Sequence, residues 1–203
     1  MVAPGWERAA RSPTAIVGSL PASRRCALGI QKGVASMADL AITPLPTPHL
    51  VLLRLHRADQ AAFTAASAVL QLPTRPGAVV VTGGVEATWV RPDGWLLRSG
   101  DAGLLIQRLT SALTGHLHQA IDWGPSRAEI AVSGRDGAAL LASGATTPVD
   151  GSGLPIGHAT HLRLADALVL VHRTDQANWR LTIERAMADW LLAWLEDAAM
   201  SLA

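Results

Sequence analysis

Residues 121–142 read IDWGPSRAEIAVSGRDGAALLA and carry a strand, a turn and the start of a helix in one stretch. Between residues 126 and 133, apolar side chains alternate with others, which is the period of a strand that is buried on one face. The run Ser-Gly-Arg-Asp-Gly (133–137) then supplies turn-forming residues, and the Ala/Leu-rich run after it favours a helix. The stretch therefore predicts a strand that turns directly into a helix.

A glycine-containing turn of this kind can bind phosphate, because the free N–H groups of a helix N-terminus favour an anion. The dinucleotide pattern needs three glycines as G-x-G-x-x-G, and a P-loop needs Gly-Lys followed by Ser or Thr. Only Gly134 and Gly137 occur here, and residues 37–203 contain no lysine. We therefore interpret this segment as a structural turn in which Asp136 favours the helix start.

Outward from this stretch, the C-terminal half consists of short strands and ends in a helix. The predicted strands are 116–123, 126–133, 158–165, 167–174 and 178–184, with helices at 136–143 and 185–200. The loop between 146 and 157 is rich in turn formers. In the last helix a single apolar stripe recurs at helical spacing and is formed by Met187, Trp190, Leu191, Trp194, Leu195 and Ala198.

The N-terminal half follows a related order. Predicted strands cover 50–57, two segments of 78–90 around Gly83-Gly84, and 95–98, with helices at 60–70 and from Asp101 to about Leu113. Asp59 and Asp101 are the expected N-caps. The pattern predicts an α+β fold with mainly antiparallel sheets and packed helices, in two strand–helix–strand lobes (about 49–115 and 116–203) of a single domain over 37–203.

The composition is that of a folded chain, with 49% hydrophobic and 16% charged residues among 203. Residues 37–203 hold 12 arginines and 15 acidic residues, a balance of −3, so no basic face for nucleic acid is expected. No apolar run approaches the roughly 18 residues of a membrane span. The sole cysteine, Cys26, fits a reducing cytoplasm.

Residues 1–36 differ from the rest, with five basic residues against Glu7 and no sustained apolar period. The run SRRCALGIQKG has a twin-arginine export pattern only in outline, because its apolar part is short and interrupted by Gln31 and Lys32. We interpret residues 1–36 as a disordered tail or a mis-assigned start that precedes Met37.

Candidate catalytic groups are few. His116 with His118, and His158 with His161, suggest metal ligands, but the second pair lies in a predicted strand where its rings would face opposite sides. Asp122, Asp150 and Asp166 stand at element boundaries, where carboxylates commonly close turns. The chain has no G-x-S-x-G nucleophile elbow. We therefore assign no catalytic, cofactor-binding or metal residue.

Tryptophan is unusually frequent, with seven residues against one Phe and no Tyr. Trp is enriched at protein interfaces, where one end is buried and the other forms hydrogen bonds. Trp95 and Trp123 lie beside predicted turns, so we expect them, rather than Trp190 and Trp194, to be surface anchors.

The order of these segments resembles the gamma subunit of heterotetrameric sarcosine oxidase over roughly residues 50–200. The segments that carry the resemblance are PDGWLL (92–97), Asp122-Trp123 before Ser126-Arg127, VSGRDGAALLA (132–142), Pro148-Val149-Asp150, LPIGHATHLRL (154–164) and LTIERAMADWLLAWLEDAA (181–199). The sequence departs from the family at Gly124 and Pro125, where the family usually has a Ser and a polar residue.

The resemblance implies a shortened relative of the folate-binding T-protein of the glycine cleavage system. In T-protein a Gly-Gly-x-x-Asp-Asp-Leu stretch with an essential aspartate follows the segment that matches 154–164. Here the corresponding place reads LADALVL (164–170), without the glycine pair. We therefore do not assign the function of that essential aspartate to Asp166.

The resemblance also implies a non-catalytic, cytoplasmic subunit that packs on alpha, beta and delta partners. FAD, FMN, NAD, zinc and tetrahydrofolate are then expected on those partners and none in this chain. The complex would demethylate sarcosine oxidatively to glycine. Two alternatives stay open: a free-standing folate-binding protein similar to aminomethyltransferases, and a gamma-like subunit of an oxidase for another N-methyl amine.

Overall fold

The computed structural model describes residues 35–37 and 39–202. Its elements in chain order are β1(Ala35–Met37), β2(Leu40–Pro44), β3(Leu50–Leu55), α1(Gln60–Val69), β4(Val79–Thr82), β5(Val85–Arg91), β6(Gly94–Arg98), α2(Ala102–Ala112), β7(His118–Asp122), η1(Gly124–Ser126), β8(Arg127–Gly134), α3(Gly137–Ala142), β9(His158–Leu164), β10(Ala167–Asp175), β11(Asn178–Glu184), η2(Arg185–Met187) and α4(Ala188–Ser201). The tail expected over residues 1–36 lies almost entirely outside the described residues.

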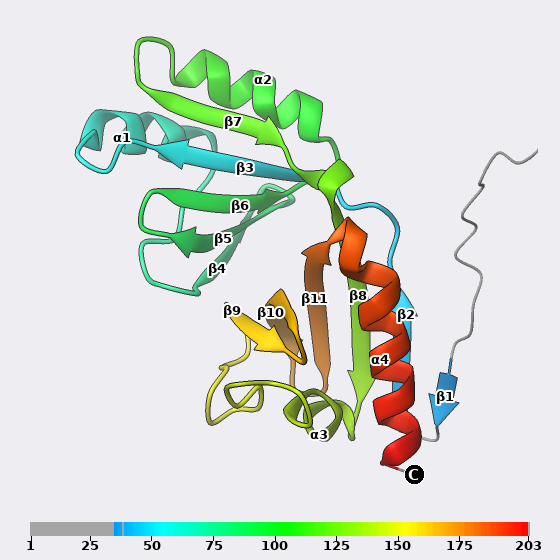
Figure 1. The fold of residues 1–203 in the computed structure, drawn as a ribbon. Helices are drawn as coiled ribbons and strands as arrows, with labels where there is room; N and C mark the ends of the chain where they lie inside the picture. Colours follow the sequence, from blue (N-terminus) through cyan, green and yellow to red (C-terminus); the bar gives the residue numbers. More distant parts are fainter. Residues whose placement is uncertain (1–34, 38, 203) are drawn as a thin grey trace, which may run out of the picture. The chain divides into compact units, whose positions relative to one another are not determined.

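Two antiparallel sheets organise these elements (Figure 1). The five-stranded sheet has the order β4-β5-β6-β3-β7, and α1 and α2 cover one of its faces. The apolar residues of β3 that face these helices alternate along the strand, as do those of β6, which is the expected pattern of a sheet with one helical layer. Asp59 and Asp101 cap the two helices through bonds from the N–H groups of Ala62 and Leu104, as predicted.

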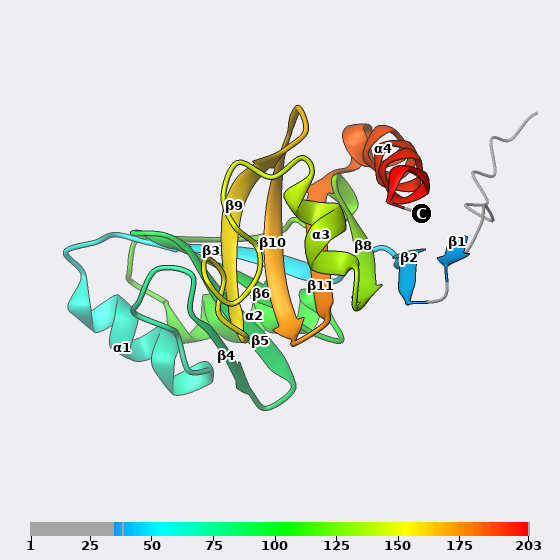
Figure 2. The same ribbon diagram turned by 90° about the horizontal axis from the view of Figure 1, so that it is seen from below.

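The six-stranded sheet has the order β1-β2-β8-β11-β10-β9. Helices α3 and α4 pack on the face turned away from the other sheet (Figures 1 and 2). Their core contains Ile130, Leu181 and Val171 from the strands and Leu141 and Leu195 from the helices, all almost completely buried. The predicted α+β class with mainly antiparallel sheets is therefore confirmed.

The strands are distributed between the sheets differently from the expected lobes of 49–115 and 116–203. β7 pairs with β3 in the five-stranded sheet, although it follows residue 115. β2 lies in a proline-spaced segment before residue 49, outside both expected lobes, and pairs with β8 in the six-stranded sheet. Pro44 is tolerated there because it is the last residue of the strand, where a missing N–H interrupts little of the ladder.

The turn at 133–137 has a steric reason for its glycine. Gly134 adopts φ +117°, and a Cβ at this position would overlap the carbonyl oxygen of Asp39, just before β2. A glycine here lets the backbone turn while β2 lies against β8. Asp136 precedes the six-residue helix α3 without a side-chain capping bond.

The sheets meet through a small apolar cluster formed by Leu50, Leu96, Ala159 and Leu170. A backbone link lies beside it, because the Ala159 N–H donates to the carbonyl of Gly77 at 2.8 Å. Gly77 permits this approach, since its φ is +71° and a Cβ would be 2.6 Å from the Ala159 oxygen. The face of each sheet that is not covered by helices thus turns toward the other sheet.

Candidate functional site

The three aspartates singled out in the sequence lie in separate turns. An Asp122 oxygen accepts from the Gly124 N–H at 3.0 Å. Asp150 accepts from the N–H and the hydroxyl of Ser152, and these bonds lower the pKa of its carboxyl group. Asp166 is exposed in the β9–β10 hairpin, 3.6 Å from Arg163. The fold therefore does not bring these carboxylates together.

The His116–His118 pair is tied to the start of α1. His116 Nδ1 is 2.9 Å from an Asp59 carboxylate oxygen, and His118 Nδ1 is 2.9 Å from the His116 carbonyl. The pKa of Asp59 is lowered first by the Ala62 N–H bond and then by His116. Both rings thus have local structural partners.

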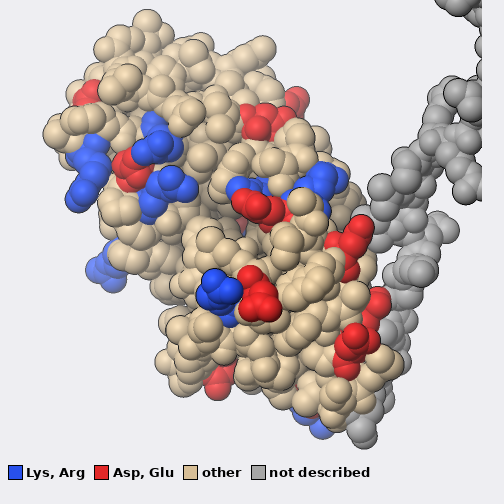
Figure 3. Space-filling view, viewed as in Figure 1, with Lys and Arg blue, Asp and Glu red and all other residues tan. Residues whose placement is uncertain are grey.

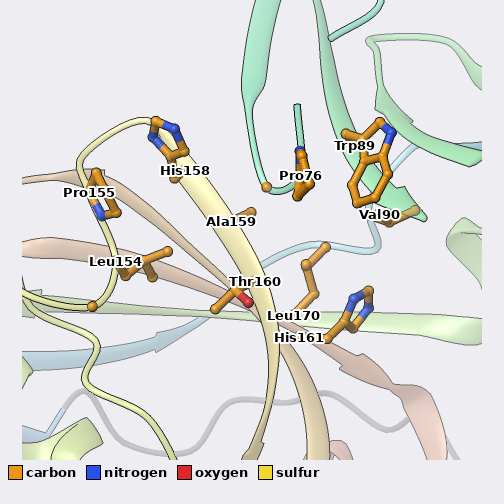
Figure 4. Close-up of a pocket in the computed structure, with 12 residues that line it drawn as sticks. Pro76, Trp89, Val90, Leu154, Pro155, His158, Ala159, Thr160, His161 and Leu170 are labelled. Carbon is orange, nitrogen blue, oxygen red and sulfur yellow. The ribbon is translucent and has the colours of Figure 1, made fainter. Parts of the chain in front are cut away.

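His158 and His161 lie at opposite ends of a pocket of about 390 Å³ (Figure 4). The start of β9 forms one side of this pocket, and Pro76 of the turn before β4 and Trp89 of β5 form the opposite side. Among the residues that the structure describes, no Asp, Glu, Lys or Arg lines it. Within the described residues no group of three or more His, Cys, Asp or Glu side chains could hold a metal ion.

The expectation for the tryptophans is wrong for Trp95. Its side chain is buried, and its indole N–H donates to the Pro73 carbonyl at 2.8 Å. Trp123 is half-buried at the junction of the sheets, whereas Trp190 of α4 is exposed. The apolar alternation of β6 places Trp95 among the residues under α1 and α2, and this packing overrides its position beside a turn.

Five ionisable side chains and a threonine form a buried charge cluster between the sheets: Glu86, Arg98, Glu129, His172, Arg180 and Thr182. Arg98 pairs with Glu129, and Arg180 pairs with Glu86. The Glu129 side chain is only 1% exposed and also accepts from the Thr182 hydroxyl at 2.9 Å. Two arginines and two glutamates make the cluster electrically neutral.

Burial and neighbouring charges set the protonation in this cluster. The pKa of His172 is lowered to about 4, first by burial and further by Arg180 and Arg98 against the opposing effect of Glu86. Arg180 Nη2 lies 2.8 Å from His172 Nδ1, a geometry in which the neutral ring accepts a hydrogen bond. Burial also lowers the pKa of Arg98 to about 10. At neutral pH the cluster is thus a set of ion pairs around a neutral histidine, in which the buried Arg98 Nε has no hydrogen-bond partner among the described residues.

A second pocket of about 310 Å³ opens at one end of the space between the sheets. We call it the junction pocket, and its main lining residues are Arg91, Trp123, Arg127, His161, Leu168 and Glu184. The Arg127 guanidinium lies 3.8 Å from the centre of a Trp123 ring. His161 is exposed as a residue, but it lies among the residues that line the pocket, which partly desolvate its ring. This desolvation lowers the pKa of His161 first, and the positive charges of Arg91 and Arg127 lower it further.

Sequence reasoning missed both features. Glu86, Glu129 and Arg180 each stand between apolar residues of their strands, a pattern that equally describes a solvent-facing surface. Trp123 and His161 stood out individually, but no sequence signal joins them in one pocket. On the face in Figure 3, arginines and carboxylates lie in small mixed groups over the described residues.

None of the helices in the part of the chain that the structure describes is long and apolar enough to span a bilayer.

The fold places the chain in a structural class. It is an α+β domain of two antiparallel sheets, each with a helical layer on its outer face. Aminomethyltransferase T of the glycine cleavage system from Bartonella henselae shares this fold, with a TM-score of 0.58 and 16% identity. That match covers 78% of this chain and 45% of the transferase. The predicted relation to the T-protein fold is therefore confirmed.

Within this class, residues 55–201 match the sarcosine oxidase, gamma subunit family, and the chain belongs to that family. It is 27% identical over 139 residues to sarcosine oxidase subunit gamma of Corynebacterium sp. (strain U-96), covering 68% of this chain and 67% of the relative. Its identity to the gamma subunit of an Arthrobacter sp. is 26% over 143 residues, 70% of each chain. A chain of the heterotetrameric sarcosine oxidase from Corynebacterium sp. U-96 superposes with a TM-score of 0.76 at 23% identity, covering 83% of this chain and 87% of that chain.

Proposed function

We propose that this protein is an accessory subunit of a heterotetrameric sarcosine-oxidase-type complex and supplies no catalytic, cofactor-binding or metal-binding residue. The observation that carries the proposal is the family match over residues 55–201, which includes strands of both sheets. The complex would convert sarcosine to glycine by oxidative demethylation on its partner subunits.

The geometry of the chain supports a structural role. The middle of the space between its sheets is occupied by apolar contacts and by a neutral set of ion pairs. Asp122 and Asp150 are engaged in turns, and Asp166 lies on an exposed hairpin. A subunit of this kind contributes by covering partner surface, and obligate interfaces commonly bury on the order of 2,000 Å² or more.

The resemblance suggests alpha, beta and delta subunits as partners, in the cytoplasm. FAD, FMN, NAD, zinc and tetrahydrofolate would then be bound by those partners.

Co-purification tests the proposal. The chain is tagged, expressed at its natural level in its own cells and purified, with an untagged strain as the control. A yellow preparation that contains two large subunits and a small one and oxidises sarcosine is the expected result. A colourless, monodisperse monomer would contradict it. A panel of N-methyl amines given to the same preparation then decides whether sarcosine or another amine is the preferred substrate.

A folate-binding function is the second candidate, favoured by the fold shared with aminomethyltransferase T. It predicts saturable binding of tetrahydrofolate to the purified chain and loss of that binding in Asp122→Asn or Asp166→Asn. In an accessory subunit neither effect is expected. Titration followed by the seven tryptophans distinguishes the two functions.

A further inference from the structure

The junction pocket has an excess of positive charge. Arg91 reaches it from β5 and Arg127 from the start of β8, so each sheet contributes one guanidinium group. Glu184 is the carboxylate in the pocket lining, and its side chain is 68% exposed at 3.5 Å from Arg127. One exposed carboxylate thus faces two arginines.

Arg127 is held in place by Trp123, and its one carboxylate partner among the described residues is the exposed Glu184 at 3.5 Å. Its side chain is 16% exposed and stacks on Trp123, and its buried Nε has no hydrogen-bond partner among the described residues. A guanidinium group carries five N–H donors in a fixed fork that matches a carboxylate. The buried Nε is out of reach of an incoming group, but the terminal N–H groups, which Glu184 engages only at 3.5 Å, are donors that a second carboxylate can use.

Arg91 is exposed and forms no ion pair with any carboxylate of the described residues. A register shift between Trp89 and Arg91 interrupts the alternation of β5, a feature that re-aims side chains at strand ends. Its aliphatic stem lies over Gly94, where a Cβ would be 2.7 Å from the Arg91 Cγ. Local structure therefore supports the side chain while leaving its charge available.

The rim of the pocket is apolar on one side. Leu168 of β10 lines it with 65% of its surface exposed, and Leu96 and Leu170 of the inter-sheet cluster also line the pocket. Arginine and tryptophan are enriched at the centres of protein–protein interfaces, where charged groups lie beside apolar contacts. The junction pocket has this composition.

We propose that the junction pocket is a docking site for a partner subunit, which inserts an acidic side chain between Arg91 and Arg127 and covers Leu168 with an apolar residue. The inference rests on the proposed function, because it names the surface through which the accessory subunit joins its complex. Charge complementarity selects the occupant: two guanidinium groups, whose charge the single exposed Glu184 only partly offsets, fit a carboxylate.

The test measures how much of the large subunits is retained by the tagged chain in its own cells. Arg91→Glu places a negative charge where the carboxylate would enter, and we expect at least about tenfold lower retention, since like charges at an interface are strongly unfavourable. Arg135→Glu is the matched control, because Arg135 follows the opposite end of β8 and is 80% exposed. The amount of the large subunits retained by this variant is expected to stay within about twofold of the wild type, because Arg135 lies outside the proposed contact.

A second variant guards against misfolding of the first. Leu168→Asp changes an exposed side chain, and Val81→Asp is its control at a similarly exposed strand position. Loss of retention in both pocket variants, with both controls preserved, supports the docking site. Retention of the large subunits by both pocket variants, or equal loss in the controls, overturns it while leaving the proposed function intact. If the wild type itself retains no large subunit, the proposed function fails and the docking site fails with it.

Discussion

Replacing Glu129 by Gln is expected to destabilise the fold more than any surface substitution of similar size. The change removes one negative charge from the buried charge cluster and leaves Arg98 and Arg180 with Glu86 alone. Breaking one partner of a buried ion pair costs about 3–5 kcal/mol. Since the amide oxygen of Gln can still accept from Thr182, we expect about 3 kcal/mol, which corresponds to about 9 °C in Tm for a chain of this size.

The free energy of unfolding is measured by urea denaturation of dilute protein, followed by tryptophan fluorescence. Glu184→Gln is the matched control, because it also removes one carboxylate 3.5 Å from an arginine but at a largely exposed position. We expect this control to change the free energy of unfolding by less than about 1 kcal/mol.

The reasoning is refuted if Glu129→Gln costs no more than the control, because the cluster would then be hydrated and weakly coupled. A double variant sharpens the comparison. Adding Arg98→Met to Glu129→Gln leaves Arg180 and Glu86 as the charged residues of the cluster beside neutral His172, so that the cluster is again electrically neutral. The double variant is therefore expected to lower the free energy of unfolding by at least about 1 kcal/mol less than the sum of the two single changes.

Three further predictions concern single positions. The pKa of His172 is about 4 in the folded state, against the ordinary value of 6.5 in the unfolded chain. The contribution of this group to the free energy of unfolding is therefore fully present above pH 6.5, and it is lost as the pH falls from 6.5 toward 4, because the unfolded chain takes up the proton first. Denaturation across this range is expected to show a loss of at most about 3 kcal/mol that His172→Gln lacks; parallel pH profiles for both proteins would contradict this. Gly134→Ala, which would overlap the Asp39 carbonyl, is expected to cost about 3 kcal/mol, against about 1 kcal/mol for Gly115→Ala at φ +85° in open space; equal Tm losses would refute the steric argument. Arg185 donates to the carbonyls of Pro125 and Arg127 and to Thr47, so Arg185→Ala is expected to lower the free energy of unfolding by about 1–2 kcal/mol, while the exposed Arg163→Ala changes it by less than about 0.5 kcal/mol.

Local features of the fold were predictable from the sequence because their causes are local. The caps at Asp59 and Asp101 depend on a carboxylate one residue before a helical pattern, and the structure has both bonds. The Gly83-Gly84 hairpin depends on two residues with positive φ, and both glycines have it. Strand and helix types followed from periodicity over the same short range.

Features that depend on pairing between distant segments were not predictable. The pairing of β2 with β8 joins residues about 90 apart, and nothing in a proline-spaced segment marks its partner. Glu129 lies in a strand whose alternation indicates one buried face, and its own face reads as solvent-exposed. It is buried because a second sheet covers that face, and a single strand carries no signal for such a neighbour.

The buried charge cluster has a consequence for docking that stability alone does not describe. Apolar contacts such as Leu96 with Leu170 are non-directional, whereas the ion pairs of the buried charge cluster are directional and join β5 and β6 to β8 and β11, which sets the register of one sheet against the other. Arg91 and Arg127 come from different sheets, so the distance between them depends on that register. Glu129→Gln is therefore expected to reduce retention of the large subunits by more than its folded fraction explains, at a temperature where the variant remains folded. If retention follows the folded fraction alone, the cluster acts only on stability.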